Sequence, residues 1–398
     1  MLRIGIVAGE ASGDQLGAGL IRAIKERLPD AVFEGVAGPK MIEAGCTALY
    51  PVERLSVMGL VEVLGHLPDL LRIRRALRRH FLEHPPDLFI GIDAPDFNLG
   101  LERSLKAAGI TTVHYVSPTV WAWRQGRVRK LARSMDLMLT IFPFEADFYA
   151  GRGLDVRFVG HPLADLIPDT VDRRAARRAL GLPEEGRIVA LLPGSRGTEL
   201  RYLGAPFVQA AAWCRARHPE LLFVTPTANA GTRAALEAAW RTHAPDLPLT
   251  VVDGRSHEVM AAADVVLAAS GTATLEAVLL KRPLVVAYRV APLSHWIFRD
   301  LGLIKVPYIA MPNLLAGREI AREFIQDAAT PENLGQALLA LLENPDAGAE
   351  MERIFSDIHR SLRRDASRNA AEAVLELIER KKNIGGTHGQ RPTTAGQT

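Results

Sequence analysis

The stretch that decides the fold is residues 264–289, DVVLAASGTATLEAVLLKRPLVVAYR. It starts with a short apolar run, passes through small and hydroxylated residues into a helix-like segment carrying Glu276, and ends in a second apolar run. Apolar runs that alternate with amphipathic segments are typical of buried parallel strands joined by crossover helices. A strand that ends in small residues at a helix N-terminus is a common way to hold a phosphate group.

The same alternation extends over most of the chain, and a basic stretch bounded by prolines at residues 163–186 divides it. We expect an α/β protein of two Rossmann-like, doubly wound domains facing a central cleft, at residues 1–165 and 186–345. Helices should follow at 346–382, and a polar, disordered tail at 383–398. The apolar runs expected to be strands are LRIGIVAGE, VFEGVAG, DLFIGIDAP, TTVHYVSP, LMLTIFPF and VRFVGHP, then RIVALLPGS, LLFVTPTAN, PLTVVDG, DVVLAAS, PLVVAYRV and YIAMPNLL.

Composition sets the class of protein. The 398 residues are 48% hydrophobic and 23% charged, as in ordinary soluble proteins, and a net charge of +3 gives no support to nucleic-acid binding. Cys46 and Cys214 are far apart, so we expect reduced thiols in a cytosolic protein, with neither a disulfide framework nor a zinc site. The first apolar run reads as a strand rather than a signal peptide, and no apolar window is long enough to predict a transmembrane helix.

The loop after the strand that ends near Ala269 suits a diphosphate. Gly271 lets the backbone approach a ligand, and Thr272 and Thr274 offer hydroxyls beside the free amides of a helix N-terminus. Glu276 follows in the first turns of that helix, where a carboxylate could accept both hydroxyls of a ribose. The alternative is an ordinary capped helix whose Glu276 favours the helix dipole.

A second loop, LLPGSRGTE at residues 191–199, carries Ser195 and Arg196 at another strand end. An arginine there can neutralise the charge that builds on a departing diphosphate, a role otherwise filled by a divalent metal. The alternative is a surface arginine paired with Glu199.

The first half carries two comparable loops. AGEASGD, residues 8–14, makes a tight turn containing Ser12, and it lacks the glycine patterns of dehydrogenases and P-loop ATPases. GIDAPDFN, residues 91–98, places Asp93 at the end of an apolar strand, where a carboxylate can take a proton from an attacking alcohol. A plain strand–helix turn is the alternative for the first loop, and capping of the next helix, which suits Asp96 better, is the alternative for the second.

Three further groups stay open. Trp121 and Trp123, near His114, could stack on bases, grip sugars, sit at a membrane surface or pack in the core. His161 could bind phosphate or a loop carbonyl. Residues 55–80 combine apolar side chains with arginines, which favours an anionic membrane surface over a buried helix with a solvated basic face. The candidate membrane or acyl-binding residues are Val57, Met58, Leu60, Val61, Leu64, Arg72, Arg75 and Arg79.

Taken together, the motifs resemble those of the lipid-A-disaccharide synthases, a family of GT-B-like glycosyltransferases, from about residue 4 to 375. The strings that carry the likeness are AGEASGD, GIDAPDFN, HYVSPTVWAWR, VGHP, LLPGSR, ASGTATLE and PNLLAGRE, in this order.

The resemblance implies an inverting, metal-independent transfer of 2,3-diacylglucosamine from UDP-2,3-diacylglucosamine to 2,3-diacylglucosamine 1-phosphate, giving a β-1,6-linked disaccharide phosphate and UDP. It implies no cofactor, and a cytoplasmic enzyme that is peripheral on the inner face of the Gram-negative inner membrane. The catalytic residues would be Asp93, as general base, and Arg196. The residues that would bind UDP or substrate are Ser12, Ser195, Ser270, Gly271, Thr272, Thr274, Glu276 and Asn313.

Two other functions remain as alternatives. A sugar-nucleotide epimerase would share the paired domains but would need no apolar, basic surface at residues 55–80. A non-catalytic UDP-sugar sensor would close around the nucleotide without turnover.

Overall fold

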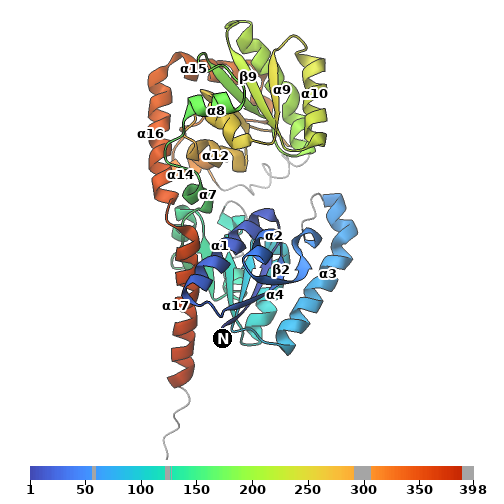
Figure 1. The fold of residues 1–398 in the computed structure, drawn as a ribbon, viewed down its shortest axis with the longest axis vertical. Coiled ribbons are helices and arrows are strands. Elements are labelled where there is room, and N and C mark those ends of the chain that lie inside the picture. The colour runs from blue at the N-terminus through green and yellow to red at the C-terminus, as the bar shows by residue number, and fades with distance from the viewer. Residues whose placement is uncertain (56–59, 122–125, 127, 291–305, 388–398) are drawn as a thin grey trace, which may run out of the picture. The chain divides into compact units, whose positions relative to one another are not determined.

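The computed structural model describes residues 1–55, 60–121, 126, 128–290 and 306–387. The chain forms two compact α/β units (Figure 1). Unit 1 comprises Met1–Pro162 together with the chain from Arg363 onward, and unit 2 comprises Leu163–Leu362. The expected α/β class with two parallel-sheet domains is therefore confirmed.

Unit 1 is built on a parallel sheet of seven strands among the described residues, in the order β3-β2-β1-β4-β5-β6-β7. Its strands are β1 (Arg3–Ala8), β2 (Val32–Ala37), β3 (Cys46–Pro51), β4 (Leu88–Ile92), β5 (Thr111–Tyr115), β6 (Leu137–Thr140) and β7 (Asp155–Phe158). Its helices are α1 (Ala11–Arg27), α2 (Pro39–Glu43), α3 (Leu60–Glu83), α4 (Pro95–Ala107), α5 (Val128–Ala132), α6 (Pro143–Tyr149) and α17 (Ala366–Thr387), with short 3-10 turns η1 (Val52–Arg54) and η2 (Thr119–Trp121).

Unit 2 repeats this plan with a parallel sheet of six described strands, in the order β10-β9-β8-β11-β12-β13. Its strands are β8 (Ile188–Leu192), β9 (Leu222–Thr227), β10 (Leu249–Asp253), β11 (Val265–Ala269), β12 (Leu284–Tyr288) and β13 (Glu323–Ile325). Its helices are α7 (Pro162–Leu166), α8 (Arg173–Ala179), α9 (Gly197–Arg215), α10 (Ala230–His243), α11 (Ser256–Ala262), α12 (Thr272–Leu279), α14 (Met311–Ala316), α15 (Pro331–Glu343) and α16 (Pro345–Leu362).

The central strands are apolar throughout because helices cover both faces of each sheet. All five residues of β4 are buried, as are those of β8 and β11. In unit 1, Leu20 and Ile24 of α1 pack with α17 against one face of the sheet. Ile73 and Leu77 of α3 pack with α4 against the other face.

Helices α16 and α17 follow each other in sequence but belong to different units. Helix α16 packs in unit 2, whereas α17 lies along α1 in unit 1 (Figure 1). Ala370, Val374 and Leu377 of α17 join the core of unit 1. The sequence groups both helices in one segment, 346–382, because each shows the same helical period.

One expected strand is wrong, and one observed strand has no counterpart among the expectations. Strand β3 carries no long apolar run, and we had not expected it. YIAMPNLL is not a strand: Pro312 stands in the first turn of α14, and the last strand of the sheet is the three-residue β13 further along. Helix α17 extends to Thr387, past the expected start of the tail at 383, and residues 388–398 lie outside the described residues.

In each sheet the strand order reverses once at the centre. The reversal falls between β1 and β4 in unit 1, where Ala8 pairs with Ile92, and between β8 and β11 in unit 2, where Leu192 pairs with Ala268. Crossover connections leave such a point in opposite directions, so the loops at the carboxyl ends of these strands border a crevice. Ser12 and Asp93 of unit 1, and Ser195, Arg196 and Ser270–Thr272 of unit 2, follow these four strands.

Candidate active site

Unit 2 has a cavity of about 870 Å³ at the carboxyl ends of β8, β9, β11 and β12. Ser195, Arg196, Ser270, Gly271 and Thr272 all line it, together with Glu276. Six of the candidate residues selected from the sequence therefore line one cavity. The cavity also includes Glu199, Tyr288 and Arg289, which had no binding role in the sequence-based assignment.

The loop after β8 is held by Glu199. One carboxylate oxygen, Oε2, accepts hydrogen bonds from the backbone N–H of Ser195 (2.9 Å) and of Arg196 (3.2 Å). Gly194 makes this possible, because it has a φ of 129° and a Cβ there would lie 2.4 Å from the Glu199 side chain. Glu199 thus binds the loop backbone, and among the described residues no ion pair joins it to the guanidinium of Arg196. The side chain of Arg196 is exposed at the start of α9.

The turn between β11 and α12 is open toward the cavity. Gly271 precedes α12, and apart from its chain neighbours no atom of the described residues lies within 4 Å of the position that its Cβ would take. Thr274 is buried and turned away: its hydroxyl donates to the carbonyl of Gly271 at 2.7 Å. Thr274 therefore stabilises the turn, while Ser270, Gly271 and Thr272 border the cavity.

Glu276 lies one turn further along α12 and has a partner from α11. Its Oε2 is 3.4 Å from Nε2 of His257. The hydrogen bond to Glu276 is the main cause that raises the pKa of His257 above its ordinary value, and burial opposes it. No sequence pattern indicates His257, because its contact with Glu276 forms only when α11 and α12 lie side by side in the fold.

Asn313 lies in α14 and is completely buried. Its Nδ2 donates to the carbonyl of Ala321 (2.7 Å) and to Glu323 Oε1 (2.8 Å), and its Oδ1 accepts from the N–H of Ile320 (2.8 Å) and Ala321 (2.9 Å). All four hydrogen-bonding positions of the amide are thus used inside unit 2. In this structure Asn313 ties α14 to the segment that leads into β13.

In unit 1, Asp93 begins a strained turn at the end of β4. Asp93 (φ 50°) and Ala94 (φ 43°) are both left-handed, a conformation that non-glycine residues rarely adopt in succession. The N–H of Asp93 donates to the carbonyl of Tyr115 (2.8 Å), and Nδ2 of Asn98 donates to the carbonyl of Asp93 (2.8 Å). A Cβ on Gly9 would lie 2.3 Å from Cβ of Ala94, so the loops after β1 and β4 are in close contact.

Asn98 and a buried pair lie beneath this turn. Glu102, one helical turn beyond Asn98, approaches Nδ1 of His114 at 2.6 Å, and both side chains are fully buried. Burial raises the pKa of Glu102, and His114 partly opposes that rise. Gly91 provides the space, since a Cβ there would be 2.1 Å from Oε1 of Glu102. His114 is therefore a core residue, and the sequence missed Asn98 as the residue that holds Asp93.

The loop after β1 has two different parts. Ser12 is exposed in the first turn of α1. Asp14 is buried and accepts hydrogen bonds from the N–H groups of Gly38 (2.9 Å), Lys40 (3.0 Å) and Met41 (3.0 Å). Asp14 thus fixes the start of α2 rather than facing a ligand.

The structure decides two of the three open aromatic and histidine assignments. Trp121 is buried and donates from Nε1 to Glu145 Oε1 at 3.1 Å, so it packs in the core. His161 is buried against Phe142, and burial lowers its pKa to about 4. A neutral imidazole at pH 7 is a weak partner for phosphate. Trp123 lies outside the described residues.

The basic part of α3 is amphipathic. Ile73, Leu77 and Phe81 are buried, whereas Arg72, Arg75 and Arg79 are exposed. Arg72 pairs with Asp69. Val57 and Met58 lie outside the described residues, as do the side chains of Leu60, Val61 and Leu64.

The described residues contain neither a helix able to span a membrane nor a cluster of metal-binding side chains. None of the helices described here combines the length and the apolar character needed to cross a membrane. No group of three or more histidine, cysteine, aspartate or glutamate side chains within the described ranges gathers as a metal site would require.

Solved structures share this architecture. The UDP-GlcNAc 2-epimerase of Neisseria meningitidis, bound to UDP-GlcNAc, matches with a TM-score of 0.60 at 12% identity, covering 95% of this chain and 99% of that one. The glycotransferase of kitacinnamycin matches with a TM-score of 0.60 at 17% identity, covering 95% and 98%. At these identities the likeness shows the fold alone. This two-domain fold occurs in epimerases and in glycosyltransferases.

Sequence comparison gives the family. The family model described as lipid-A-disaccharide synthetase matches residues 4–378. The lipid-A-disaccharide synthase of Azotobacter vinelandii is 59% identical over 381 residues, covering 96% of this chain and 99% of that protein. The synthases of Pseudomonas aeruginosa (57%, covering 96% and 99%) and Hahella chejuensis (52%, covering 95% and 95%) are similar over the same span. The chain belongs to the lipid-A-disaccharide synthase family, and the epimerase and sensor alternatives are not favoured.

The contact between His257 and Glu276 predicts a pH dependence of stability. The pKa of His257 is raised in the folded state, so the contact stabilises the protein fully below the ordinary value of 6.5 and less as pH rises through the folded-state pKa. The difference in Tm between wild type and His257→Gln should therefore be largest below pH 6.5 and shrink at alkaline pH. Thermal unfolding of both proteins from pH 5.5 to 9 measures it, and a difference independent of pH would contradict the assignment.

Proposed function

We propose that this chain transfers 2,3-diacylglucosamine from UDP-2,3-diacylglucosamine to 2,3-diacylglucosamine 1-phosphate, releasing UDP. The observation that carries the proposal is the placement of the reactive groups at both strand-order reversals. Asp93 stands at the reversal of unit 1, and Arg196 and Ser270 to Thr272 line one cavity at the reversal of unit 2.

In the proposed mechanism, Asp93 accepts the proton of the acceptor's 6-hydroxyl as its oxygen attacks the anomeric carbon of the donor. The bond from that carbon to the β-phosphate oxygen breaks, and UDP leaves with the bonding electrons. A single displacement inverts the anomeric configuration, which gives the β-1,6 linkage. The strained turn and the hydrogen bond from Asn98 hold the Asp93 backbone in one orientation, which favours such a reaction by positioning.

The leaving diphosphate needs stabilisation in unit 2. The amides of Ser195 and Arg196 are occupied by Glu199, so the Arg196 guanidinium is the cationic group that this loop offers to phosphate oxygens. The Thr272 hydroxyl and the first amides of α12, which lack intrahelical acceptors, add neutral donors. Cationic and amide donors together supply the charge stabilisation, so we propose that no metal or cofactor takes part.

The remaining candidate residues either contact the substrate or hold other parts of the site in position. Glu276 would accept the ribose hydroxyls, and Ser12, Ser195 and Ser270 are exposed or half-buried at the loops that meet substrate. Thr274 and Asn313 act as positioning residues, since their polar atoms are bound to the protein.

The location follows from the acylated substrates. We expect a cytoplasmic enzyme that binds the anionic inner face of the Gram-negative inner membrane without spanning it. The exposed arginines of α3 would attract the lipid headgroups, and Val57, Met58, Leu60, Val61 and Leu64 would enter the interface.

Substitution of the general base tests the reaction. Asp93→Asn keeps the size of the side chain, tolerates a positive φ, and removes the proton acceptor. Mixed with both diacylated substrates, it should form the disaccharide about 10²–10⁴-fold more slowly than wild type while binding UDP equally well. Asp365→Asn is the matched control, because Asp365 also has a positive φ (56°). Turnover of Asp93→Asn at the wild-type rate would remove Asp93 from the mechanism.

Reversal of three charges tests the membrane contact. Replacement of Arg72, Arg75 and Arg79 by Glu should abolish co-sedimentation with vesicles rich in phosphatidylglycerol, because attraction becomes repulsion. The control carries the same change in net charge elsewhere, at the exposed Arg201, Arg241 and Arg353 of unit 2. Equal vesicle binding by the two triple variants would contradict the role of α3.

A further inference from the structure

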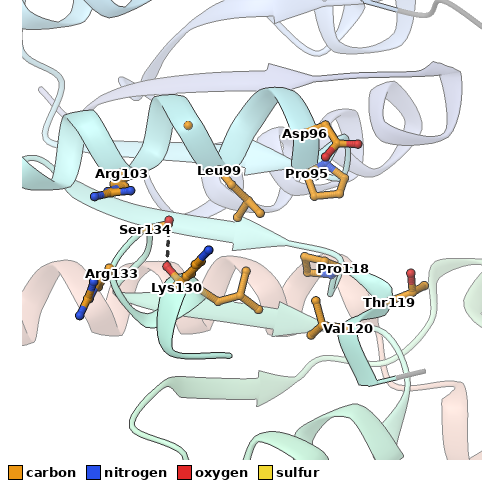
Figure 2. Close-up of a pocket in the computed structure, with 12 residues that line it drawn as sticks. Pro95, Asp96, Leu99, Arg103, Pro118, Thr119, Val120, Lys130, Arg133 and Ser134 are labelled. Carbon is orange, nitrogen blue, oxygen red and sulfur yellow. Dashed lines mark hydrogen bonds between the residues drawn. The ribbon is translucent and has the colours of Figure 1, made fainter. Parts of the chain in front are cut away.

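Unit 1 contains a cavity that the proposed mechanism does not use. It has a volume of about 430 Å³ and lies between α4, the segment after β5 and α5 (Figure 2). Pro95, Leu99 and Arg103 contribute from one face of α4. Nζ of Lys106 donates to the carbonyl of Ala132 at 3.1 Å, which ties the far end of α4 to α5 and fixes the width of the cavity.

The cavity is electrically asymmetric. Arg103, Lys130 and Arg133 lie toward one end, and Asp96 lies at the other (Figure 2). The three cations come from two separate segments of the chain and are exposed. Within the described ranges, none of the three takes part in an ion pair. Two planar guanidinium groups and an ammonium group at one end suit the several oxygens of a phosphate monoester.

The wall between the two ends is apolar. Leu99 from α4 faces Pro118 and Val120 (Figure 2), and Leu131 also lines the cavity. A free phosphate ion would leave this wall exposed to water, whereas a phosphate joined to hydrocarbon would cover it. The cavity therefore fits an anionic amphiphile better than an inorganic anion.

The position of the cavity relates it to Asp93. Pro95 and Asp96 line its acidic end, two and three residues after Asp93 in the chain. Arg103 is seven residues beyond Asp96 on α4, which places it about 10 Å further along the helix axis. A hexose with its reacting hydroxyl at Asp93 and an anomeric phosphate on the opposite side of the ring would point that phosphate toward the cations. The acyl chain on C2, next to the anomeric carbon, would then meet the apolar wall.

We infer that this cavity binds the phosphate-bearing end of the acceptor, with Arg103, Lys130 and Arg133 holding the phosphate and Leu99, Val120 and Leu131 contacting the neighbouring acyl chain. The inference rests on the proposed function and extends it, because it assigns specificity between acceptor and donor to unit 1. Donor and acceptor carry the same acylated sugar, so recognition of the monoester is a chemical means of telling them apart.

Equilibrium binding in detergent micelles tests the inference without turnover. Wild type should bind 2,3-diacylglucosamine 1-phosphate at least about tenfold more tightly than 2,3-diacylglucosamine, because charge-assisted hydrogen bonds form only with the phosphate. Arg103→Gln combined with Arg133→Gln should lose this preference, as should Lys130→Gln in part. Arg129→Gln is the matched control, since Arg129 is exposed on α5 and does not line the cavity.

Three results would overturn the inference. The first is that the double variant keeps the preference for the phosphorylated acceptor. The second is that the double variant loses affinity equally for both acceptors. The third is that it loses binding to phosphatidylglycerol vesicles but keeps the phosphate preference, which would make the cluster a membrane contact. Arg103→Lys with Arg133→Lys keeps the charge and should retain most of the preference, which separates recognition from misfolding. If wild type prefers the phosphorylated acceptor in the binding assay but forms no disaccharide, the proposed function is contradicted and this inference is supported.

Discussion

In both units the order of the parallel strands reverses at the centre of the sheet, and this constraint positions every candidate reactive group. Crossover helices leave the reversal in opposite directions, so the loops after β1 and β4, and after β8 and β11, are not covered by a connection. Gly9 and Gly271 contribute no side chain to these loops. Gly9 permits the close approach of Ala94, and Gly271 leaves open space at the start of α12. A side chain placed there is partly or fully exposed, while the strand that precedes it is buried.

Polar side chains next to these loops maintain this arrangement. Asn98 and Asn313 are buried and Glu199 is half-buried, and each of the three forms hydrogen bonds to the backbone of a loop or helix in its own unit. Asn98 holds the Asp93 turn, Glu199 holds the Arg196 loop, and Asn313 holds the segment before β13. We propose that such residues act on the reaction only through the groups that they position, whereas Asp93 and Arg196 contact the substrate.

Features that depend on the local pattern of residues could be predicted from the sequence. Central strands such as β4 and β11 are apolar from end to end, and the small residues after them mark the loops. Features that depend on contacts between distant segments could not be predicted. Strand β3 is an edge strand with exposed residues, α17 joins α1 across more than 300 residues of sequence, and His257 meets Glu276 only after α11 and α12 pack. Asn313 was selected for its motif, but its four hydrogen bonds become evident only in the fold.

The central claim is that unit 2 holds the diphosphate of UDP between Arg196 and the start of α12. A crystal structure of the full chain with UDP measures this most directly. The account predicts phosphate oxygens within hydrogen-bonding distance of the Arg196 guanidinium and of the Thr272 hydroxyl or amide, with the ribose hydroxyls on Glu276. A diphosphate bound away from both Arg196 and α12 would contradict it.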